Sequence, residues 1–215
     1  MDFGKNVSDS LAYAQEGLIG KWTKWVLLII STIIFPLMLG YVVRILKGAT
    51  PSPEPEDWGG LFIDGIKLFI VGLIYAIPVI ILEVLAMGSI IASAVSGDPA
   101  ALMAGMAGAG LIFLVLVIVA IIIGLFEATA YPRFARTGSF GEAFNFNAIL
   151  AHIGKIGWVN YIIALIILAV IWGVIEVICM IIPIIGFLIL LIILPFLILF
   201  AARYLTLLYD SAGAA

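Results

Sequence analysis

Two long stretches of this sequence, Ile112–Phe126 and Ile181–Leu199, contain no charged residue. The second approaches the roughly 20 apolar residues with which an α-helix crosses a bilayer. The whole chain has the same character, with 65% hydrophobic residues, 11% charged residues and a mean hydropathy of +1.33. A soluble domain has about 45–50% apolar and about 25% charged residues. We therefore expect an all-α, polytopic integral membrane protein.

Residues 1–215 are expected to form a single membrane domain with four to five transmembrane helices. Charged and proline-containing stretches mark the boundaries between its parts. Residues 1–24 are expected to form an interfacial helix, because Val7, Leu11, Ala14 and Leu18 recur at helical spacing. A partly ordered tail is the alternative for this segment. The other predicted parts are a first hairpin or span at 25–46, a charged connection at 47–67, a second hairpin at 68–131, an amphipathic connection at 132–156 and a third hairpin at 157–208.

The tip of the second hairpin has an unusual composition. Residues 96–110 are rich in Gly, Ala, Met and Pro, with Asp98 as the one charge, and are predicted to form a loop. Small residues recur within it at every fourth position, at Ala101, Gly105 and Ala109, which would let helices pack closely. A flexible tether is the other interpretation. After Tyr131, Pro132 is expected to break the span into a polar connection.

A weak internal repeat links the charged parts of the chain. Arg44-x-x-Lys47-Gly48 resembles Arg133-x-x-Arg136-x-Gly138, and an aromatic-Gly-x-x-Phe motif occurs at 58–62 and again at 140–144. Each repeat would enter the membrane at a lysine and leave it at an arginine. The pairs are Lys24 with Arg44, Lys67 with Arg133, and Lys155 with Arg203.

The repeat favours one topology over another. If all three repeats enter and leave on one face, all 10 Lys and Arg residues lie on the same side, as the positive-inside rule prefers. Five plain spans would instead place Lys5, Lys21 and Lys24 on the opposite side. The one-faced arrangement requires Trp25–Val43, within the first segment 25–46, to be a re-entrant hairpin that turns near Phe35–Pro36, with halves of about 14 Å in a core of about 30 Å. We favour this arrangement, and the five-span version stays open.

Three carboxylates lie inside apolar stretches and are the candidate intramembrane polar site: Glu83, Glu127 and Glu176. An ionisable group at membrane depth is costly, so a functional role is the first hypothesis. Helical rise places Glu83 about 24 Å beyond Lys67 and Glu176 about 31 Å beyond Lys155, where both could also reach the far interface. Glu127 could pair near the surface with Arg133. A proton or cation site and a purely interfacial role therefore both stay open.

Basic residues that flank the expected spans are candidate anchors for lipid phosphate, namely Arg44, Lys67, Arg133, Lys155 and Arg203. His152 has no second His or Cys at ligand spacing, so we expect a surface position and no metal site. Cys179 is expected to serve packing. The sequence contains no recognisable catalytic set or phosphate-binding loop, so we expect the protein not to be an enzyme and to bind no cofactor. The net charge of −3 implies no nucleic-acid partner.

Two stretches of the sequence are similar to a known family. Gly40-Tyr41-x-x-Arg44 is followed by Pro53-Glu54-Pro55-Glu56-Asp57-Trp58-Gly59-x-Leu61-Phe62-x-Asp64-Gly65-x-Lys67, and the chain closes with Ala202-Arg203-Tyr204 and Leu208-Tyr209-Asp210. The whole resembles a family of uncharacterised polytopic membrane proteins, a domain of unknown function common in archaea and especially methanogens. The resemblance implies an archaeal cytoplasmic membrane and supplies no activity or catalytic residue. Residues 97–110 do not match it.

Two functions from different classes remain. The first is a non-enzymatic, self-associating membrane scaffold or assembly protein, which short hairpins and small-residue surfaces would suit. The alternative is a small transporter or channel subunit that uses Glu83 and Glu176. We favour the scaffold, because few polar groups converge at mid-membrane. Expected partners are membrane lipids, further copies of the chain and a protein partner at the charged connections, which are predicted to be cytoplasmic in a multi-pass protein of the cell membrane.

Overall fold

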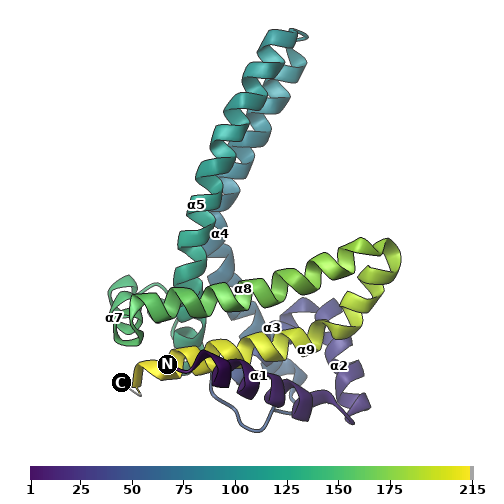
Figure 1. The fold of residues 1–215 in the computed structure, drawn as a ribbon, viewed down its shortest axis with the longest axis vertical. Helices are drawn as coiled ribbons and strands as arrows, with labels where there is room; N and C mark the ends of the chain where they lie inside the picture. Colours follow the sequence, from purple (N-terminus) through teal and green to yellow (C-terminus); the bar gives the residue numbers. More distant parts are fainter. Residues whose placement is uncertain (214–215) are drawn as a thin grey trace. The chain divides into compact units, whose positions relative to one another are not determined.

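The computed structural model describes residues 1–213, and at positions 183 and 184 the backbone alone. The described chain is almost entirely α-helical and contains no β-strand, which confirms the all-α prediction (Figure 1). The helices are α1 (Phe3–Leu18), α2 (Trp22–Ile33), α3 (Phe35–Leu46), α4 (Trp58–Val95), α5 (Pro99–Thr137), α6 (Phe140–Ala143), α7 (Phe146–Ile156), α8 (Trp158–Ile181) and α9 (Pro183–Asp210), with a 3-10 turn at Ser211–Gly213.

Four of these helices are long and apolar enough to cross a membrane: α4, α5, α8 and α9. The helices α2 and α3 pass the same test only as a pair, and they are bent by 120° with respect to each other. Each has 12 residues, or about 18 Å, too short to cross a hydrocarbon core of about 30 Å. The structure therefore confirms four to five candidate spans and a break in the first one.

The bend between α2 and α3 lies where the sequence predicts it. Ile34 ends α2, and α3 begins at Phe35 with Pro36 in its first turn. Proline is well suited to that position because its missing N–H would have no partner in the first turn of a helix.

The chain forms two compact units. Unit 1 comprises Met1–Val71 with Ala128–Ala215, and unit 2 comprises Gly72–Glu127. Helices α4 and α5 each run from one unit into the other.

Helix α9 is the centre of unit 1, and α1, α2, α3, α7 and α8 all pack against it. Its second half is buried at Leu199, Tyr204 and Leu208. The Tyr204 hydroxyl donates a hydrogen bond to the carbonyl of Ala164 in α8 (3.0 Å). The apolar side of α1 contributes Ala14 and Leu18 to this core. Helix α1 covers most of residues 1–24, and its predicted position at the membrane interface stays a prediction.

Two glycines allow α3 and the start of α4 to touch through their backbones. A Cβ atom on Gly40 would overlap the carbonyl oxygen of Leu61, and a Cβ on Gly65 would overlap that of Pro36. Helices approach this closely only where side chains are absent. The crossing fixes the α2–α3 hairpin to the beginning of the first long helix.

A tryptophan supports the middle of α9. The indole N–H of Trp25 donates to the carbonyl of Ile192 (2.8 Å), three residues before Pro195. Proline inside a helix weakens the hydrogen bonding of the preceding turn, and a carbonyl in an apolar environment needs another donor. The polar edge of the Trp25 indole serves this carbonyl.

Unit 2 is a pair of helical segments joined by a short turn. The predicted loop at 96–110 is wrong, because α5 already begins at Pro99 and the Asp98 carboxylate accepts a hydrogen bond from the amide of Ala100 (2.9 Å). A Cβ on Gly105 would overlap the Ser93 side chain of α4, and Ala109 is buried. The close-packing interpretation of these small residues is therefore correct and the flexible tether is not.

The predicted break at Pro132 is also wrong. Helix α5 continues through Pro132 to Thr137 and ends before Gly138, whose φ of +68° is the left-handed conformation typical of a residue that follows a helix. Proline lacks the N–H that would bind the carbonyl four residues earlier, and helices in membrane proteins tolerate this loss. In the last turn of α5, the Thr137 hydroxyl donates to the carbonyl of Arg133 (2.9 Å).

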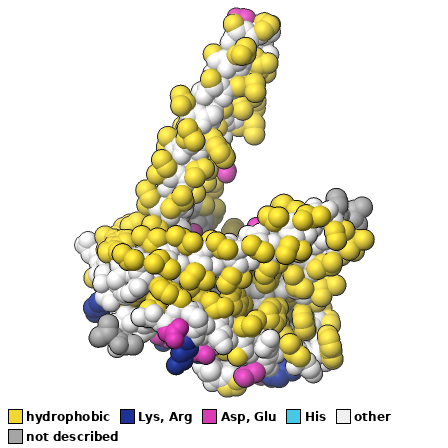
Figure 2. All heavy atoms as spheres, viewed as in Figure 1, with side chains coloured by type: hydrophobic (Ala, Val, Ile, Leu, Met, Phe, Trp, Pro, Cys, Tyr) yellow, Lys and Arg dark blue, Asp and Glu magenta, His cyan; other side chains and the backbone are white. Residues whose placement is uncertain are grey.

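Apolar side chains cover the visible surface of α5, α8 and α9 (Figure 2). Charged side chains gather on the side of unit 1 where α1 and the two chain ends lie. The most apolar window of α8 has only 6% of its residues buried within the chain. Most of this surface is consequently available to lipid or to other proteins.

Candidate functional site

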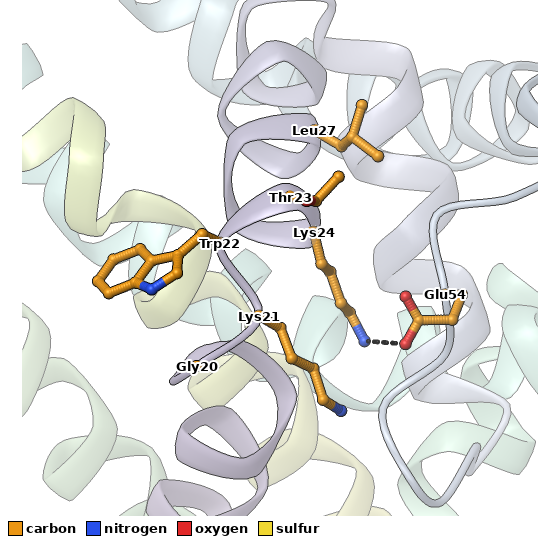
Figure 3. A pocket seen from close by; sticks show the side chains of 7 residues that line it. All are labelled: Gly20, Lys21, Trp22, Thr23, Lys24, Leu27 and Glu54. Atoms are coloured by element: carbon orange, nitrogen blue, oxygen red, sulfur yellow. Dashed lines mark hydrogen bonds and ion pairs between the residues drawn. The ribbon is translucent and has the colours of Figure 1, made fainter.

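The main polar site of unit 1 is the loop cluster, which we define as Tyr13, Lys24, Tyr41, Ser52 and Glu54. Lys24 is only 4% exposed. Its ammonium donates to the Ser52 hydroxyl (3.0 Å), the Ser52 carbonyl (3.1 Å) and the Glu54 carboxylate (3.3 Å). Figure 3 shows the Lys24 and Glu54 side chains pointing toward one another from α2 and the connection 47–57.

Two tyrosines hold the same connection from other helices. The Tyr41 hydroxyl of α3 donates to the carbonyl of Pro53 (2.6 Å) and lies 2.8 Å from the Ser52 hydroxyl. The Tyr13 hydroxyl of α1 donates to the carbonyl of Ala49 (3.1 Å). The proline-rich connection is therefore tied to three helices of unit 1.

The loop cluster places a serine, a lysine and a tyrosine together, as some hydrolytic sites do, but the hydrogen bonds argue against a nucleophile. A base must offer a lone pair to the serine proton. The Lys24 ammonium instead donates to three oxygens, one of them a carboxylate oxygen of Glu54 at 3.3 Å. Ser52 is also 7% exposed, so the arrangement fixes the connection rather than preparing an attack.

The end of this connection is fixed separately. The Arg44 guanidinium donates to the carbonyl of Glu56 (2.7 Å) and pairs with the Asp57 carboxylate (3.3 Å). Asp57, with a φ of +54°, accepts a hydrogen bond from the amide of Gly60 (3.1 Å) and so caps the start of α4.

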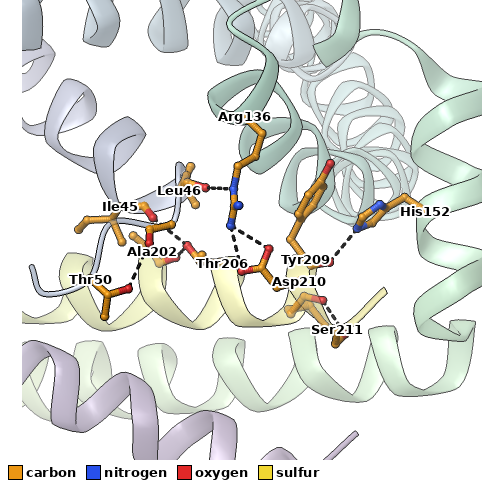
Figure 4. A network of polar contacts seen from close by, with 12 residues as sticks. Ile45, Leu46, Thr50, Arg136, His152, Ala202, Thr206, Tyr209, Asp210 and Ser211 are labelled. Atoms are coloured by element: carbon orange, nitrogen blue, oxygen red, sulfur yellow. Dashed lines mark hydrogen bonds and ion pairs between the residues drawn. The ribbon is translucent and has the colours of Figure 1, made fainter. Parts of the chain in front are cut away.

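A second polar site, the exit cluster, joins the C-terminal ends of α3, α5 and α9 (Figure 4). Arg136 of α5 donates to the carbonyl of Leu46 (2.8 Å) and to both oxygens of the Asp210 carboxylate (2.8 and 2.9 Å). The hydroxyl of Thr206 donates to the carbonyl of Ile45 (3.2 Å). The carbonyls at a helix end lack partners within the helix, and here residues of the two other helices supply them.

Gly48 makes room for this cluster. It follows α3 with a φ of +93°, and the place of its missing Cβ lies 3.0 Å from the Arg136 guanidinium. The repeat that pairs Arg44-x-x-Lys47-Gly48 with Arg133-x-x-Arg136-x-Gly138 thus corresponds to two helix ends that meet in the structure.

His152 adjoins the exit cluster. Its ring stacks on that of Tyr209 at 3.9 Å between centroids, and its Nε2 lies 2.9 Å from the carbonyl of Tyr209. Burial lowers the pKa of His152, partly opposed by this hydrogen bond, and the charges of Arg133 and Lys155 lower the pKa further. His152 is partly buried in an α7–α9 contact, so the predicted surface position is only half right.

The three candidate carboxylates have different surroundings. Glu83 is exposed and belongs to unit 2, whereas Glu176 is exposed and belongs to unit 1. Glu176 accepts a hydrogen bond from the Trp172 indole (2.8 Å) and borders a hollow of about 390 Å³ between α8 and α9. Glu127 is partly buried near the end of unit 2. A joint site of Glu83 and Glu176 stays a prediction.

The candidate lipid anchors are mostly engaged with protein groups. Arg133 pairs with Glu142, and Lys67 pairs with Asp64 (3.6 Å). Arg203 lies over the ring of Tyr13 at 5.1 Å, a cation–π contact. Lys155 is exposed in the last turn of α7, and Arg44 binds the end of the connection as described. Their role toward lipid phosphate stays a prediction.

Residues 25–184, most of the chain, match the model of a family described as "Protein of unknown function (DUF4013)". The chain belongs to the DUF4013 family. No curated protein and no solved structure matches it. The resemblance to a domain of unknown function is therefore correct. Together, the family match and the four long apolar helices of the structure indicate an integral membrane protein of unknown activity.

The matched DUF4013 region contains Tyr41, Ser52 and Glu54 of the loop cluster and Arg136 of the exit cluster. Tyr13, Lys24, Thr206 and Asp210 lie outside it. Sequence reasoning did not select Lys24, Tyr41, Ser52 or Arg136 as site residues. Their partners are far along the chain, 28 residues for Lys24 and Ser52 and 90 for Arg136 and Leu46. The available signal was the repeat, which contains Arg136, and the position of Lys24 at the entry of the first repeat.

Among residues 1–213, no group of three or more His, Cys, Asp or Glu side chains lies close enough to hold a metal ion. Cys179 lies at the tip of the third hairpin, where a Cβ on Gly186 would overlap its carbonyl oxygen. The close approach of α8 and α9 at this tip is backbone packing.

Proposed function

We propose that the protein is a non-enzymatic integral membrane scaffold that associates with further copies of itself. The observation that carries the proposal is a hollow on the outside of the α8–α9 hairpin. Three of its lining residues are small, Ala169 and Gly173 of α8 and Ala201 of α9, beside larger side chains such as Leu165 and Trp172. A Cβ on Gly173 would meet nothing within 4 Å. Spacing of four residues between small side chains lets another helix approach closely in a membrane.

Lipid would cover a large outward side chain as well as a protein does, because hydrophobic burial drives little association inside a bilayer. Outward small residues are different, since they offer lipid few contacts and offer a helix van der Waals packing along the backbone. We therefore assign this hollow to a helix of a second copy.

The proposal includes a location and an orientation. The resemblance implies an archaeal cytoplasmic membrane, and we place the charged connections on its cytoplasmic side, where a protein partner could reach them. The meeting of α3, α5 and α9 at the exit cluster supports a common side for the three repeat exits.

The test is the mass of the particle in nanodiscs by light scattering, corrected for lipid. A discrete assembly of several copies is expected for the natural chain. The variants Gly173→Leu and Ala169→Leu should reduce it toward the monomer, whereas Val174→Leu, a matched substitution on an exposed neighbouring position of α8, should leave it unchanged. A natural chain that is monomeric would refute the proposal.

A small transporter or channel subunit is the second candidate, and one observation favours it. Glu176 places a carboxylate at the edge of the same hollow, hydrogen-bonded by Trp172. In liposomes, proton or cation flux that is lost in both Glu83→Gln and Glu176→Gln would support transport. No flux above that of empty liposomes would reject it and leave the scaffold.

A further inference from the structure

A cavity of about 370 Å³ lies where α1 ends and α2 begins. Its polar wall is formed by Lys21, Lys24 and Glu54, while Leu27 closes its apolar side. In Figure 3 the Lys21 side chain extends to the same side of α2 as the Lys24–Glu54 pair, and the Trp22 ring points away from them.

A second hollow of about 370 Å³ continues along α2. It is lined by Trp22, Thr23, Val26 and Leu27, and it shares all of these except Val26 with the first cavity. Its surface is mainly apolar, with the Thr23 hydroxyl and the Trp22 indole N–H as its polar side-chain groups. Trp22 is 71% and Val26 54% exposed. A cavity with a charged wall and an apolar groove therefore adjoin on one short helix.

The charged wall of the first cavity is net positive, with two lysines and one glutamate. The Lys24 ammonium is shared with Glu54 and Ser52. Lys21 is exposed and, within residues 1–213, its ammonium forms no ion pair. The first amides of α2 add partial positive charge, because no side chain caps this helix start. One lysine thus faces the cavity with its charge uncompensated.

We propose that these adjoining hollows bind one phosphate-bearing membrane lipid. The headgroup phosphate lies against Lys21, and the first part of one acyl chain follows Val26 and Leu27. The Trp22 indole, amphipathic and exposed, sits at the boundary between headgroup and chain, as interfacial aromatic residues do. The site does not depend on self-association, and a monomeric chain would still bind this lipid.

The experiment uses the full chain, stripped of lipid in detergent and titrated with phosphatidylglycerol while native mass spectrometry counts bound molecules. Lys21→Gln should weaken the tightest binding about fivefold, the effect of one lysine charge at a lipid headgroup. Lys5→Gln removes an equally exposed lysine from α1 and should change nothing. Both side chains are exposed, and unchanged thermal unfolding without lipid will show that the variants fold.

Three further arms separate the sources of the phosphate. Diacylglycerol, which lacks the phosphate, should not bind at the tight site. Inorganic phosphate should compete only weakly, and Val26→Trp, which fills the groove, should reduce lipid binding. Equal losses in Lys21→Gln and Lys5→Gln, or equal binding of diacylglycerol, would overturn the proposal. Inorganic phosphate that competes fully, together with no effect of Val26→Trp, would replace the lipid by a soluble phosphate compound.

Discussion

Replacement of Lys24 by methionine tests whether the loop cluster holds unit 1 together. Methionine keeps most of the side-chain volume but removes the ammonium, and so deletes the donors to the Ser52 hydroxyl and carbonyl. A hydrogen bond from a charged donor contributes about 1.5–3 kcal/mol, and a buried acceptor left without a donor costs about 1–3 kcal/mol. Burying an ammonium also costs free energy, and methionine avoids that cost, which offsets part of the expected loss of stability.

The ion pair with Glu54 adds little to that figure. The Glu54 side chain is 53% exposed, and ion pairs screened by water contribute about 0–1 kcal/mol. We therefore expect Lys24→Met to lower the free energy of unfolding by about 2–3 kcal/mol.

Unfolding in mixed micelles by SDS titration, followed by circular dichroism, measures this change. Lys21→Met is the matched control, because Lys21 is exposed and surface substitutions change stability by about 0.5 kcal/mol or less. If the two variants unfold at the same SDS fraction, the loop cluster does not stabilise unit 1 and the reasoning fails. A double-mutant cycle with Tyr41→Phe should show coupling between Lys24 and Tyr41, since both contact Ser52.

Three further substitutions probe other contacts. Gly65→Ala should destabilise the chain by about 1–3 kcal/mol in the same titration, because its Cβ would overlap the Pro36 carbonyl; Gly59→Ala, which has room for a Cβ, is the control. Arg136→Gln should cost about 1–2 kcal/mol through the lost bonds to Leu46 and Asp210, and the idea fails if Asp210→Asn in the Arg136→Gln background costs as much as it does alone. Burial lowers the pKa of His152 in the folded chain, so the unfolded chain binds the proton first and stability should fall as the pH falls below about 6.5; a His152→Gln variant with the same pH dependence would contradict this.

The sequence allowed the helices that face lipid to be predicted well, for a physical reason. A charge-free run such as Ile181–Leu199 has few alternatives to a membrane helix, and Pro36 marks the bend between α2 and α3 because it can start a helix but not continue one. Errors arose where composition alone was used. The glycine and alanine run after Pro99 was predicted to be a loop, yet small residues serve equally well in a helix that packs against another helix.

The candidate site was less predictable, because its contacts join distant parts of the chain. Nothing local to Lys24 indicates that Ser52 will accept its hydrogen bond, and nothing local to Leu46 indicates that Arg136 will bind its carbonyl. Such pairs depend on how the helices pack around α9. The intramembrane carboxylates were easy to select by their residue type, but residue type does not determine whether water reaches them.

The side of the membrane on which each end of a helix lies can be tested with two introduced cysteines. In a Cys179→Ser background, Lys5→Cys labels the start of α1, and Met103→Cys labels the tip of the second hairpin; both positions are exposed. If α2 and α3 turn back within the bilayer, residue 5 and the charged connection at 47–57 lie on the same side. Because α4 then crosses the membrane, residue 103 lies on the other side, and an impermeant maleimide added from one side should react with only one of the two cysteines.

If α2 and α3 together form one broken span, residue 5 and residue 103 share a side and both react. The tight bend of 120° and helices of about 18 Å favour the first result, and labelling of both cysteines from one side would refute the one-faced arrangement.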